Sequence, residues 1–465
     1  MSDGRHRAPR GRSARSEEAR QRALANEQRL RALGAAVDEK SGIVRKPHAH
    51  LVPSRRRRRV VISSVVVVGL LVTLVGGGYL YALWRWSQIP KVVVPTLKYP
   101  VSGKPFNILT IGSDSRAGRT GTQASQTGTS AQVSGQRSDV VKIVHVDPTN
   151  DTVTILSIPR DTTVTLLANT GLYGTYNRIN VNYRSGPSLL AQTITANFGI
   201  VINHVVQVGF AGLINSALAI GGVYLDFPYK AHDPVSGLNM THPGCQLVTG
   251  AQALAVARSR HYYYSLHGRA WPPGYAKDSY STFAALLASR GWVYDGTSDY
   301  GRIDRQNSFL RSMLNRVKGS LGNPLKMNNF LSNLPRGVTI DSTWSLNEMI
   351  GYALKFRNFS SSAIKTYTLP TIGATVNGQD LLFVNQPYTQ QLLVNIFGSS
   401  LLPPTNPPPN DKLQPVMPPV IAPTTSTTVA PTTTTKKHGH RPPVTTTTNP
   451  TLAVQSYDPV PCAPK

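Results

Sequence analysis

Arginines and aspartates gather in five short groups within the middle of this 465-residue chain. In chain order these groups are Gly112–Arg116, Arg137–Asp139, Ser157–Asp161, Arg258–Arg260 and Asp299–Gln306. Several of them follow apolar, strand-like runs, and most are flanked by residues that favour turns. Guanidinium groups grip phosphate oxygens, and carboxylates bind the divalent cations that accompany phosphates. The five groups therefore predict a site for a phosphate or pyrophosphate.

An apolar segment precedes all five groups. The stretch from Val60 to Trp84 is almost uninterrupted apolar sequence. At a rise of ~1.5 Å per residue, a helix of this length crosses the ~30 Å hydrocarbon core of a bilayer. The run Arg55–Arg59 comes before it, so the positive-inside rule predicts a cytoplasmic N-terminus and an extracytoplasmic remainder in a single-pass cell-membrane protein.

The segment before this anchor is strongly basic. Residues 1–59 contain 17 Lys and Arg against 6 Asp and Glu, within a chain of formal net charge +27. Such a segment binds nucleic acid or lies on an anionic membrane surface. Because it abuts the apolar stretch, we expect the membrane and no nucleic acid. Its sequence has no sustained apolar face, which predicts a disordered cytoplasmic tail or a transient helix.

The rest of the chain divides by composition. Residues 60–84 form the expected transmembrane helix, 85–104 an extended stalk, 105–400 a folded domain, and 401–465 a Pro/Thr-rich extracytoplasmic tail that is a plain spacer or carries sugars. Within the domain, strand-like and helix-like segments alternate, which favours an α/β sandwich with a mixed central sheet. The expected strands are 106–111, 140–146, 152–158, 205–208 and 224–227, and the expected helices are 189–198, 210–219, 251–258, 303–318 and 346–355.

Two cysteines occur, Cys245 in the folded region and Cys462 near the end of the chain. Outside the membrane they could pair, which would tether the far end of the chain to the domain. Two free thiols are the alternative, and spacing alone leaves both open.

The charged groups, in this order behind one anchor, resemble those of the LytR–CpsA–Psr family over about residues 105–400. The motifs that carry the likeness are Asn107–Arg116, Arg137–Asp139, Ser157–Asp161, Gly250–Arg260 and Asp299–Gln306. The resemblance implies an α/β/α domain with a hydrophobic pocket for a polyprenyl chain. It also implies magnesium-dependent transfer of a glycopolymer from a polyprenyl-pyrophosphate carrier to peptidoglycan, at the bilayer surface.

The resemblance assigns roles to particular residues. Asp114 and Asp139 would hold Mg²⁺, with Mn²⁺ as the alternative cation. Arg160 would contact the phosphate. The neighbouring Asp161 would either orient Arg160 or act as the base that activates an acceptor hydroxyl.

Later motifs would complete the catalytic set. Arg258 and Arg260 are two positions apart, so both can face one site only if the helix ends near Arg258 and the chain then becomes extended. Asp299, Arg302 and Gln306 lie at i, i+3 and i+7, which is one stripe at the start of a helix.

Four further residues belong to the predicted substrate-binding set. They are Arg116, Arg137, Asn180 and Arg305. Asn180 fits turn capping equally well, and Arg305 projects from its helix in a different direction from the stripe.

Two segments have alternative interpretations. The helices expected at 189–198 and 210–219 wall the lipid pocket or simply pack in a core. The aromatic stretch 262–299 selects the glycan at the rim of the site or forms a small core of its own.

Two other functions compete with transfer. With water as the acceptor, the same site would hydrolyse the polyprenyl pyrophosphate. A non-catalytic wall-binding or regulatory protein would keep the phosphate site without metal dependence.

Overall fold

The computed structural model describes ten stretches of the chain. They are residues 13–41, 55–113, 138–273, 280–320, 328–329, 332–333, 335, 337–356, 363–413 and 456–463. Asp114, Arg116 and Arg137, together with the loop expected over 116–136, lie outside these residues. The chain forms two units, residues 1–78 and 79–465, and each is described by itself.

The N-terminal unit holds helix α1 (Ser13–Ser41) and most of α2 (Arg55–Ser87). Of the two alternatives predicted for residues 1–59, disorder or a helix, the structure has a helix over α1. Its Ala, Arg, Glu and Leu content favours a helix even though its described side chains are exposed. Within α2, Arg58–Ser87 is long and apolar enough to cross a membrane, and it is the one such helix among the described residues.

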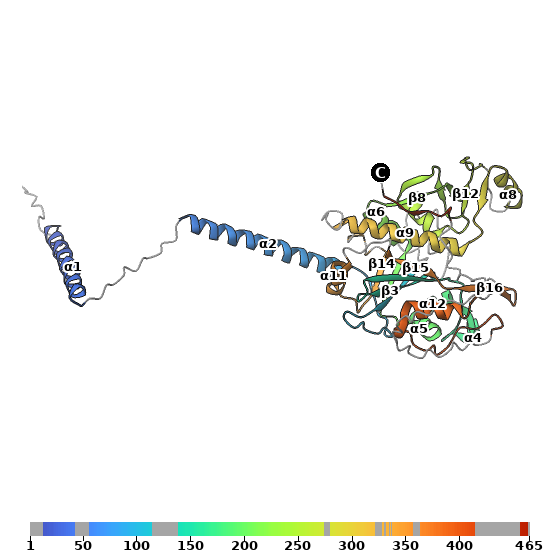
Figure 1. Cartoon of the computed structure of the whole chain (residues 1–465), viewed down its shortest axis with the longest axis horizontal. Helices are drawn as coiled ribbons and strands as arrows, with labels where there is room; N and C mark the ends of the chain where they lie inside the picture. The colour runs from blue at the N-terminus through green and yellow to red at the C-terminus, as the bar shows by residue number, and fades with distance from the viewer. Residues whose placement is uncertain are drawn as a thin grey trace, which may run out of the picture. The chain divides into compact units, whose positions relative to one another are not determined.

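The second unit is built around a mixed seven-stranded sheet (Figure 1), which confirms the predicted fold class. Its order is β1-β14-β7-β2-β3-β4-β15. Strand β2 runs parallel to β7, and β3 runs antiparallel to both β2 and β4, so Asp139 at the start of β3 lies close to Arg160 just after the end of β4. The bounds are β1 Lys91–Val92, β2 Phe106–Ser113, β3 Ser138–Asp147, β4 Thr152–Ile158, β7 His204–Gly209, β14 Val338–Asp341 and β15 Lys365–Thr368.

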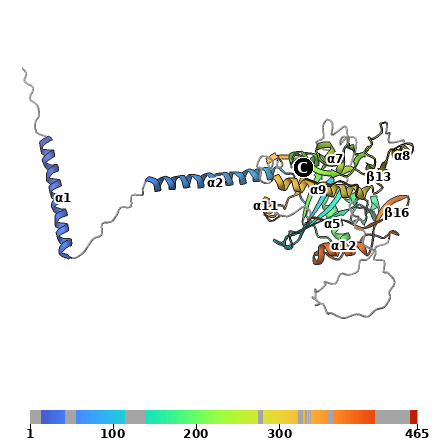
Figure 2. The ribbon, with the colours of Figure 1, turned by 45° about the horizontal axis from the view of Figure 1, so that its top comes forward.

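Helices cover both faces of the sheet. Figures 1 and 2 show α9 (Asp299–Ser320) on one side and α5 (Pro187–Phe198) with α12 (Tyr388–Phe397) on the other. The alternation of side chains along β2 explains this division. Leu109 and Ile111 are fully buried in the core against α5 and α12, whereas Thr110 and Gly112 face α9.

Shorter elements frame this sandwich. They are β5 Thr163–Thr165, α4 Thr170–Tyr173, β6 Tyr176–Arg178, η1 Ile179–Ser185, α11 Leu346–Lys355, β16 Thr371–Val376, β17 Gln379–Val384 and η6 Gly398–Ser400.

A second lobe packs on the far side of α9. It contains a three-stranded sheet, β11-β8-β18, and a four-stranded sheet, β10-β9-β12-β13. The bounds are α6 Phe210–Ala219, β8 Val223–Phe227, β9 Lys230–Asp233, β10 Leu238–Met240, β11 Gly244–Val248, α7 Gly250–Arg258, β12 Tyr263–Ser265, α8 Tyr280–Ser289, β13 Trp292–Tyr294 and β18 Val460–Pro461.

The described part of the aromatic stretch 262–299 belongs to this lobe and forms a small core of its own. Tyr263, Phe283 and Trp292 are buried together, with Trp271 and Tyr294 packed against them. The side chains proposed to stack on a glycan are thus largely used in packing. The alternative of a self-contained core therefore describes this segment better.

The expected stalk is part of the folded domain. Strand β1 pairs with β14, and Ile89 and Val94 are buried. The prolines at 90 and 95 are tolerated because β1 is a two-residue edge strand. The boundary predicted at 105 therefore lies too late in the sequence.

Two parts of the segment predicted as a Pro/Thr-rich tail pack against the folded domain. Residues 401–413 run along α5, where the Leu402 amide donates to the Gly199 carbonyl at 2.9 Å. Residues 456–463 return to the second lobe, where β18 pairs with β8 and Cys462 forms a disulfide with Cys245. Composition alone does not reveal either contact, because the partners lie far away in sequence.

Gly199 provides a test of this packing. It has a φ of +72°, and a Cβ there would lie 1.8 Å from the Leu402 carbonyl oxygen. We expect Gly199→Ala to lower the free energy of unfolding by about 2–4 kcal/mol, through both the unfavourable φ and the clash. Chemical denaturation of the full chain in detergent measures this. Gly103→Ala, at a φ of +74° with nothing within 4 Å, is the matched control, and equal losses would contradict the clash.

Candidate active site

The charged motifs converge on a small cavity between the sheet and the start of α9. The side chains that line it come from the start of β3, from the end of β4 and from α9. Its polar lining residues are Asp139, Lys142, Ser157, Arg160, Asp299, Arg302 and Gln306. Five of these seven were predicted as site residues, and Lys142 and Ser157 were not.

Arg160 lines one wall of this cavity. Its Nη1 lies 2.5 Å from Oδ1 of Asp139, and its Nε lies 3.5 Å from Oδ2 of Asp161. Burial alone would lower the pKa of Arg160, but Asp161 and Asp139 outweigh it and raise the pKa. The guanidinium is therefore held as a cation at the edge of the cavity.

Asp161 lies between two arginines. Its Oδ1 is 3.5 Å from Nε of Arg178, which stands at the end of β6 and was missed from the sequence. Asn180 is adjacent, and its backbone amide donates to the Arg160 carbonyl at 3.3 Å. These contacts favour an orienting role for Asp161 and a backbone role for Asn180.

The opposite wall is the first turns of α9. Asp299 Oδ1 lies 2.7 Å from Nη2 of Arg302 and 3.2 Å from Nε of Arg260. The same Arg302 nitrogen donates to the Asp139 carbonyl at 2.8 Å, which fastens α9 to β3. The predicted stripe at i, i+3 and i+7 thus faces one cavity.

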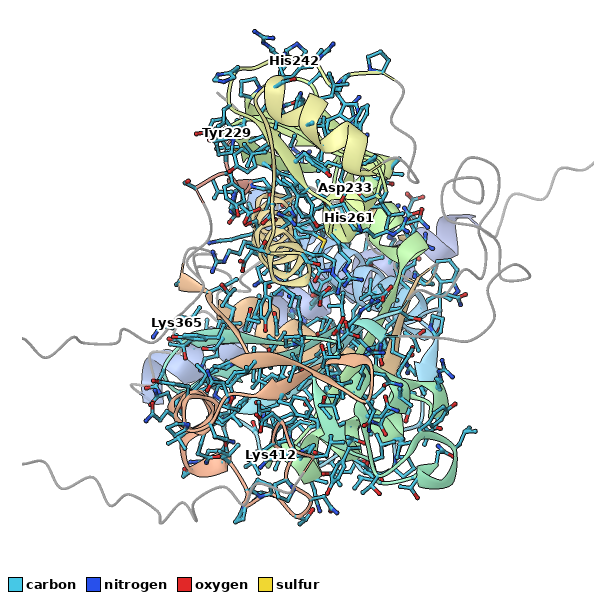
Figure 3. All side chains as sticks on the ribbon, turned by 90° about the vertical axis from the view of Figure 1, so that its right-hand side faces the viewer. Tyr229, Asp233, His242, His261, Lys365 and Lys412 are labelled. Atoms are coloured by element: carbon cyan, nitrogen blue, oxygen red, sulfur yellow. A yellow bond between two sulfur atoms is a disulfide. The ribbon has the colours of Figure 1, made fainter. Side chains whose placement is uncertain are left out.

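The segment Arg258–Arg260 has the geometry that its sequence predicts for two arginines facing one site. Helix α7 ends at Arg258, and Ser259 is extended with φ −63° and ψ 115°. Buried Asp233 holds this turn, because its carboxylate accepts from the Ser259 hydroxyl at 2.7 Å and from the His261 amide at 3.0 Å (Figure 3). Arg260 can therefore reach Asp299.

Several polar atoms of this site have no hydrogen-bond partner among the described residues. They include Nε of Arg160, Arg260 and Arg302, both carboxylate oxygens of Asp299, and Oε1 of Gln306, although the ion pairs described above bring some of these atoms near an opposite charge. Buried donors and acceptors without partners are costly in a folded protein. Clustered cationic donors of this kind fit a phosphate-bearing ligand.

The carboxylates of this site are the candidates for binding the predicted metal ion. Asp139 and Asp299 are the carboxylates of the polar cavity among the residues that the structure describes. In that part of the chain no group of three or more His, Cys, Asp or Glu could hold a metal ion. Two carboxylates plus phosphate oxygens are a set that Mg²⁺ accepts. The donor set therefore fits a cation that arrives with a phosphorylated substrate.

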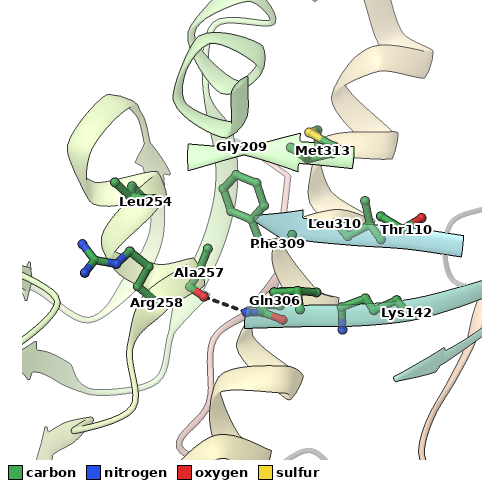
Figure 4. Close-up of a pocket in the computed structure, with 13 residues that line it drawn as sticks. Thr110, Lys142, Gly209, Leu254, Ala257, Arg258, Gln306, Phe309, Leu310 and Met313 are labelled. Carbon is green, nitrogen blue, oxygen red and sulfur yellow. Dashed lines mark hydrogen bonds between the residues drawn. The ribbon is translucent and has the colours of Figure 1, made fainter. Parts of the chain in front are cut away.

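An apolar cavity of about 150 Å³ (Figure 4) adjoins the polar one, with which it shares Val140, Lys142 and Gln306. Its floor is the sheet, where Thr110, Gly112 and Val140 lie side by side on β2 and β3, and its walls are α7 and α9. The wall residues are Leu254, Ala257 and Arg258 from α7 and Gln306, Phe309, Leu310 and Met313 from α9. The cavity suits a narrow hydrocarbon chain.

Of the two alternatives for the helix expected at 189–198, a pocket wall or a core helix, the structure has the core helix. Helix α5 lies on the opposite face of the sheet, where Leu190 and Ile194 are fully buried in the core. Gln306 closes the end of the cavity near α7, because its side-chain amide donates to the Ala257 carbonyl at 2.8 Å (Figure 4). Sequence patterns could not distinguish the helices, because all of them are apolar on the face that packs.

Lys142 lines both cavities. It is buried on β3, and its Nζ donates to Ser157 Oγ and to Asn307 Oδ1, each at 2.7 Å. Burial lowers the pKa of Lys142 to about 7, although nearby Asp304 opposes the shift. The only signal in the sequence was a lysine within the β-branched run 140–146.

Arg305 is not a substrate ligand in this structure. It is fully buried, and its Nη1 lies 2.9 Å from Asp295 Oδ2 and 2.6 Å from Asp458 Oδ1. The substrate-binding role that the motif predicts for Arg305 is therefore wrong. Arg305 follows the stripe residue Arg302 by three positions but turns into the second lobe, where buried carboxylates compensate its charge.

The sequence and fold of this chain are similar to those of known proteins. The chain matches the model of the LytR_cpsA_psr family over residues 89–269 and 289–396, which together make up more than half of it. The probable cell wall biosynthesis protein LcpB of Corynebacterium glutamicum is 29% identical over 237 residues, which cover 48% of this chain and 56% of the relative.

Two further matches agree. The polyisoprenyl-teichoic acid–peptidoglycan teichoic acid transferase TagV of Bacillus subtilis is 26% identical over 271 residues, 57% of this chain and 56% of the relative. The chain thus spans about half the length of the curated relatives it matches. A solved LytR-Csp2A-Psr enzyme from Actinomyces oris shares the fold, with a TM-score of 0.50, 19% identity, and coverage of 68% of this chain and 97% of that chain.

Lys142 generates a prediction about pH. In the unfolded chain the pKa of a lysine is about 10.4. Between the folded pKa of about 7 and that value, the unfolded chain binds a proton that the folded chain has released, so stability rises with pH. Lys142→Met removes this contribution of Lys142 to the pH dependence of stability. We expect the stability of the wild type relative to Lys142→Met to increase with pH, by at most about 1.4 kcal/mol per unit.

Denaturation curves of both proteins across this pH range measure the difference. Lys365→Met, which removes an exposed lysine from β15 (Figure 3), is the control. A difference between wild type and Lys142→Met that stays constant with pH would show that Lys142 keeps its proton in the fold.

Proposed function

Because this chain belongs to the LytR_cpsA_psr family, we propose that it is a membrane-anchored phosphotransferase. It moves a glycopolymer from a polyprenyl-pyrophosphate carrier to peptidoglycan and forms a phosphodiester link. The observation that carries the proposal is an apolar cavity that adjoins Arg160, Arg260 and Arg302, whose Nε donors make no hydrogen bond among the described residues. A polyprenyl chain in the cavity would present its pyrophosphate to those arginines. The name of the relative TagV describes a transfer of the same kind.

The arginines provide the main electrostatic contribution. Arg160, Arg260 and Arg302 are held by Asp139, Asp161 and Asp299 before any substrate arrives. Donors fixed in advance around a developing negative charge lower the barrier because they need no reorganisation during the reaction. Arg160 and Arg302 would bind the pyrophosphate oxygens, and Arg258, at the edge of the apolar cavity, would bind the phosphate on the lipid side.

The reaction is then a phosphoryl transfer. A hydroxyl oxygen of peptidoglycan attacks the phosphorus that bears the sugar, and a new P–O bond forms. The bond to the polyprenyl phosphate breaks, and this group leaves with the bonding electron pair. The hydroxyl proton passes to the Asp161 carboxylate, which would serve as the base in addition to orienting Arg160. Arg160 and Arg302 neutralise charge on the transferred and leaving phosphates.

A bound Mg²⁺, or Mn²⁺ in its place, would neutralise part of the phosphate charge. Asp139 and Asp299 are the described residues that could hold it, and Asp114 is the further ligand expected from the sequence. The partners of the protein are then the lipid-linked glycan, peptidoglycan and the bilayer, with no nucleic acid. In the proposed topology the N-terminus is cytoplasmic and the catalytic domain lies outside the cell membrane.

Arg160→Ala tests the proposed function. We expect the full chain in detergent to release polyprenyl phosphate from a synthetic polyprenyl-pyrophosphate glycan and to attach the glycan to peptidoglycan oligomers, both dependent on Mg²⁺. Arg160→Ala should lower kcat by about 10²–10³-fold, because one preorganised donor is lost. Mass spectrometry of both products measures the two reactions together.

Arg269→Ala removes an exposed arginine of the second lobe and should leave the rates unchanged. Release without attachment would replace transfer by hydrolysis. Neither release nor attachment, but retained donor binding without Mg²⁺, would favour a wall-binding or regulatory protein.

Ala257→Phe tests the apolar cavity. The added ring would fill space between α7 and the sheet, so we expect KM to rise about tenfold or more for a long polyprenyl donor and little for a short-chain donor. Steady-state rates with donors of two chain lengths measure this. Leu218→Phe, on the exposed side of α6, is the control. Equal effects on both donors would contradict the placement of the lipid in this cavity.

A further inference from the structure

One buried guanidinium connects several parts of the active-site region. The side chain of Arg305 is 0% exposed, as are those of its two carboxylate partners, Asp295 and Asp458. Its Nη2 also donates to the Ser259 carbonyl at 3.2 Å, and its guanidinium carbon lies 4.4 Å from the centre of the Tyr262 ring. A buried cation of this kind is stable only when its charge and its donors are matched.

The contacts of Arg305 fall on the elements that carry the proposed site. Arg302 lies one turn earlier on α9, and Gln306 is the next residue. Ser259, whose carbonyl Arg305 binds, stands between Arg258 and Arg260. The Arg305 side chain therefore ties the start of α9 to the segment that carries these two arginines.

One of the two carboxylates comes from the far end of the chain. Asp458 belongs to residues 456–463, which the Cys245–Cys462 disulfide and the pairing of β18 with β8 hold against the second lobe. Beside it, the Tyr457 ring stacks on Tyr264 with centres 4.4 Å apart. The Tyr457 hydroxyl donates to Asp295 Oδ1 at 3.0 Å, so this segment supports both carboxylates that face Arg305.

We infer that Asp458 is a positioning residue, and that the C-terminal segment 456–463 completes the active site by fixing Arg305 and, through it, α9 relative to the Arg258–Arg260 segment. Asp458 does not touch the substrate. Its effect is to keep Arg260 and Arg302 on the same Asp299 carboxylate. The inference rests on the proposed function for its kinetic consequence but not for its structural one.

Loss of the Asp458 charge should alter the site more than its overall fold. Asp458→Asn keeps the shape of the side chain but leaves Arg305 with one carboxylate. The guanidinium then pulls toward Asp295 and loosens its hold on the Ser259 carbonyl. A small displacement of reacting groups is sufficient to cost about 10²-fold in rate.

The experiment uses the full chain with its disulfide intact. Wild type, Asp458→Asn and Gly199→Ala are compared by hydrogen–deuterium exchange and by transfer kinetics well below their melting temperatures. Gly199→Ala destabilises the fold from the α5 side of the sheet and controls for stability alone. We expect Asp458→Asn to exchange faster over residues 257–260 and 299–306, and to lower kcat by about tenfold or more while KM for the acceptor stays similar.

The outcomes separate the inference from the proposed function. Unchanged exchange over these residues in Asp458→Asn would overturn the inference. An equal loss of kcat in Gly199→Ala, measured where the two variants have the same free energy of unfolding, would also overturn it. Cys245→Ser gives a second variant, which keeps Asp458 but removes its tether, and it should show the same exchange pattern in a milder form. If the wild type transfers nothing, the proposed function fails, and the exchange data still decide the positioning role.

Discussion

The compensation of buried positive charge is the constraint on which the rest of this structure depends. A phosphate site needs several arginines close together, and each loses hydration when the sheet and α9 close over it. Four of these guanidinium groups have carboxylate partners. Asp139 and Asp161 hold Arg160, Asp299 holds Arg260 and Arg302, and Asp295 and Asp458 hold Arg305. The arginines are then held in position in the absence of a ligand, and their Nε donors remain available to bind one.

The central sheet separates this polar chemistry from the apolar core. Because side chains alternate along β2 and β3, one face supplies Leu109, Ile111 and Ile143 to the core. The other face supplies Thr110, Gly112 and Lys142 to the two cavities. Gly112 is required at the floor, since a Cβ there would lie 2.7 Å from Cβ of Val140. The same two strands thereby serve stability on one side and ligand binding on the other.

The second lobe and the C-terminal segment support the site from behind. Helix α9 lies between the sheet and this lobe, with Phe309 buried in the second core and Gln306 facing the cavities. A helix packed on both sides can hold charged residues in a fixed direction. The cost is that residues far apart in sequence, such as Asp233, Asp295 and Asp458, must all be in place.

Local patterns predicted much of this protein. Alternating apolar runs indicated the central strands, the arginine and aspartate groups indicated a phosphate site, and Val60–Trp84 indicated a membrane-spanning helix. These features depend on neighbours within a few residues, so the sequence carries them directly. The edge strand β1 was missed, because two residues beside a proline give no periodic signal.

Only the tertiary structure decided how those groups are used. Gln306 lines the polar cavity while its neighbour Arg305 turns into the second lobe, and helix periodicity alone cannot say which direction finds buried carboxylates. Strand pairing brings Lys142 and Arg178 to the site. A disulfide between residues 217 positions apart holds the segment that carries Asp458. The amino-acid sequence by itself determined which elements form and which charges are present. The tertiary structure decided which charges meet, because the free energy of a buried charge depends on partners that local sequence does not specify.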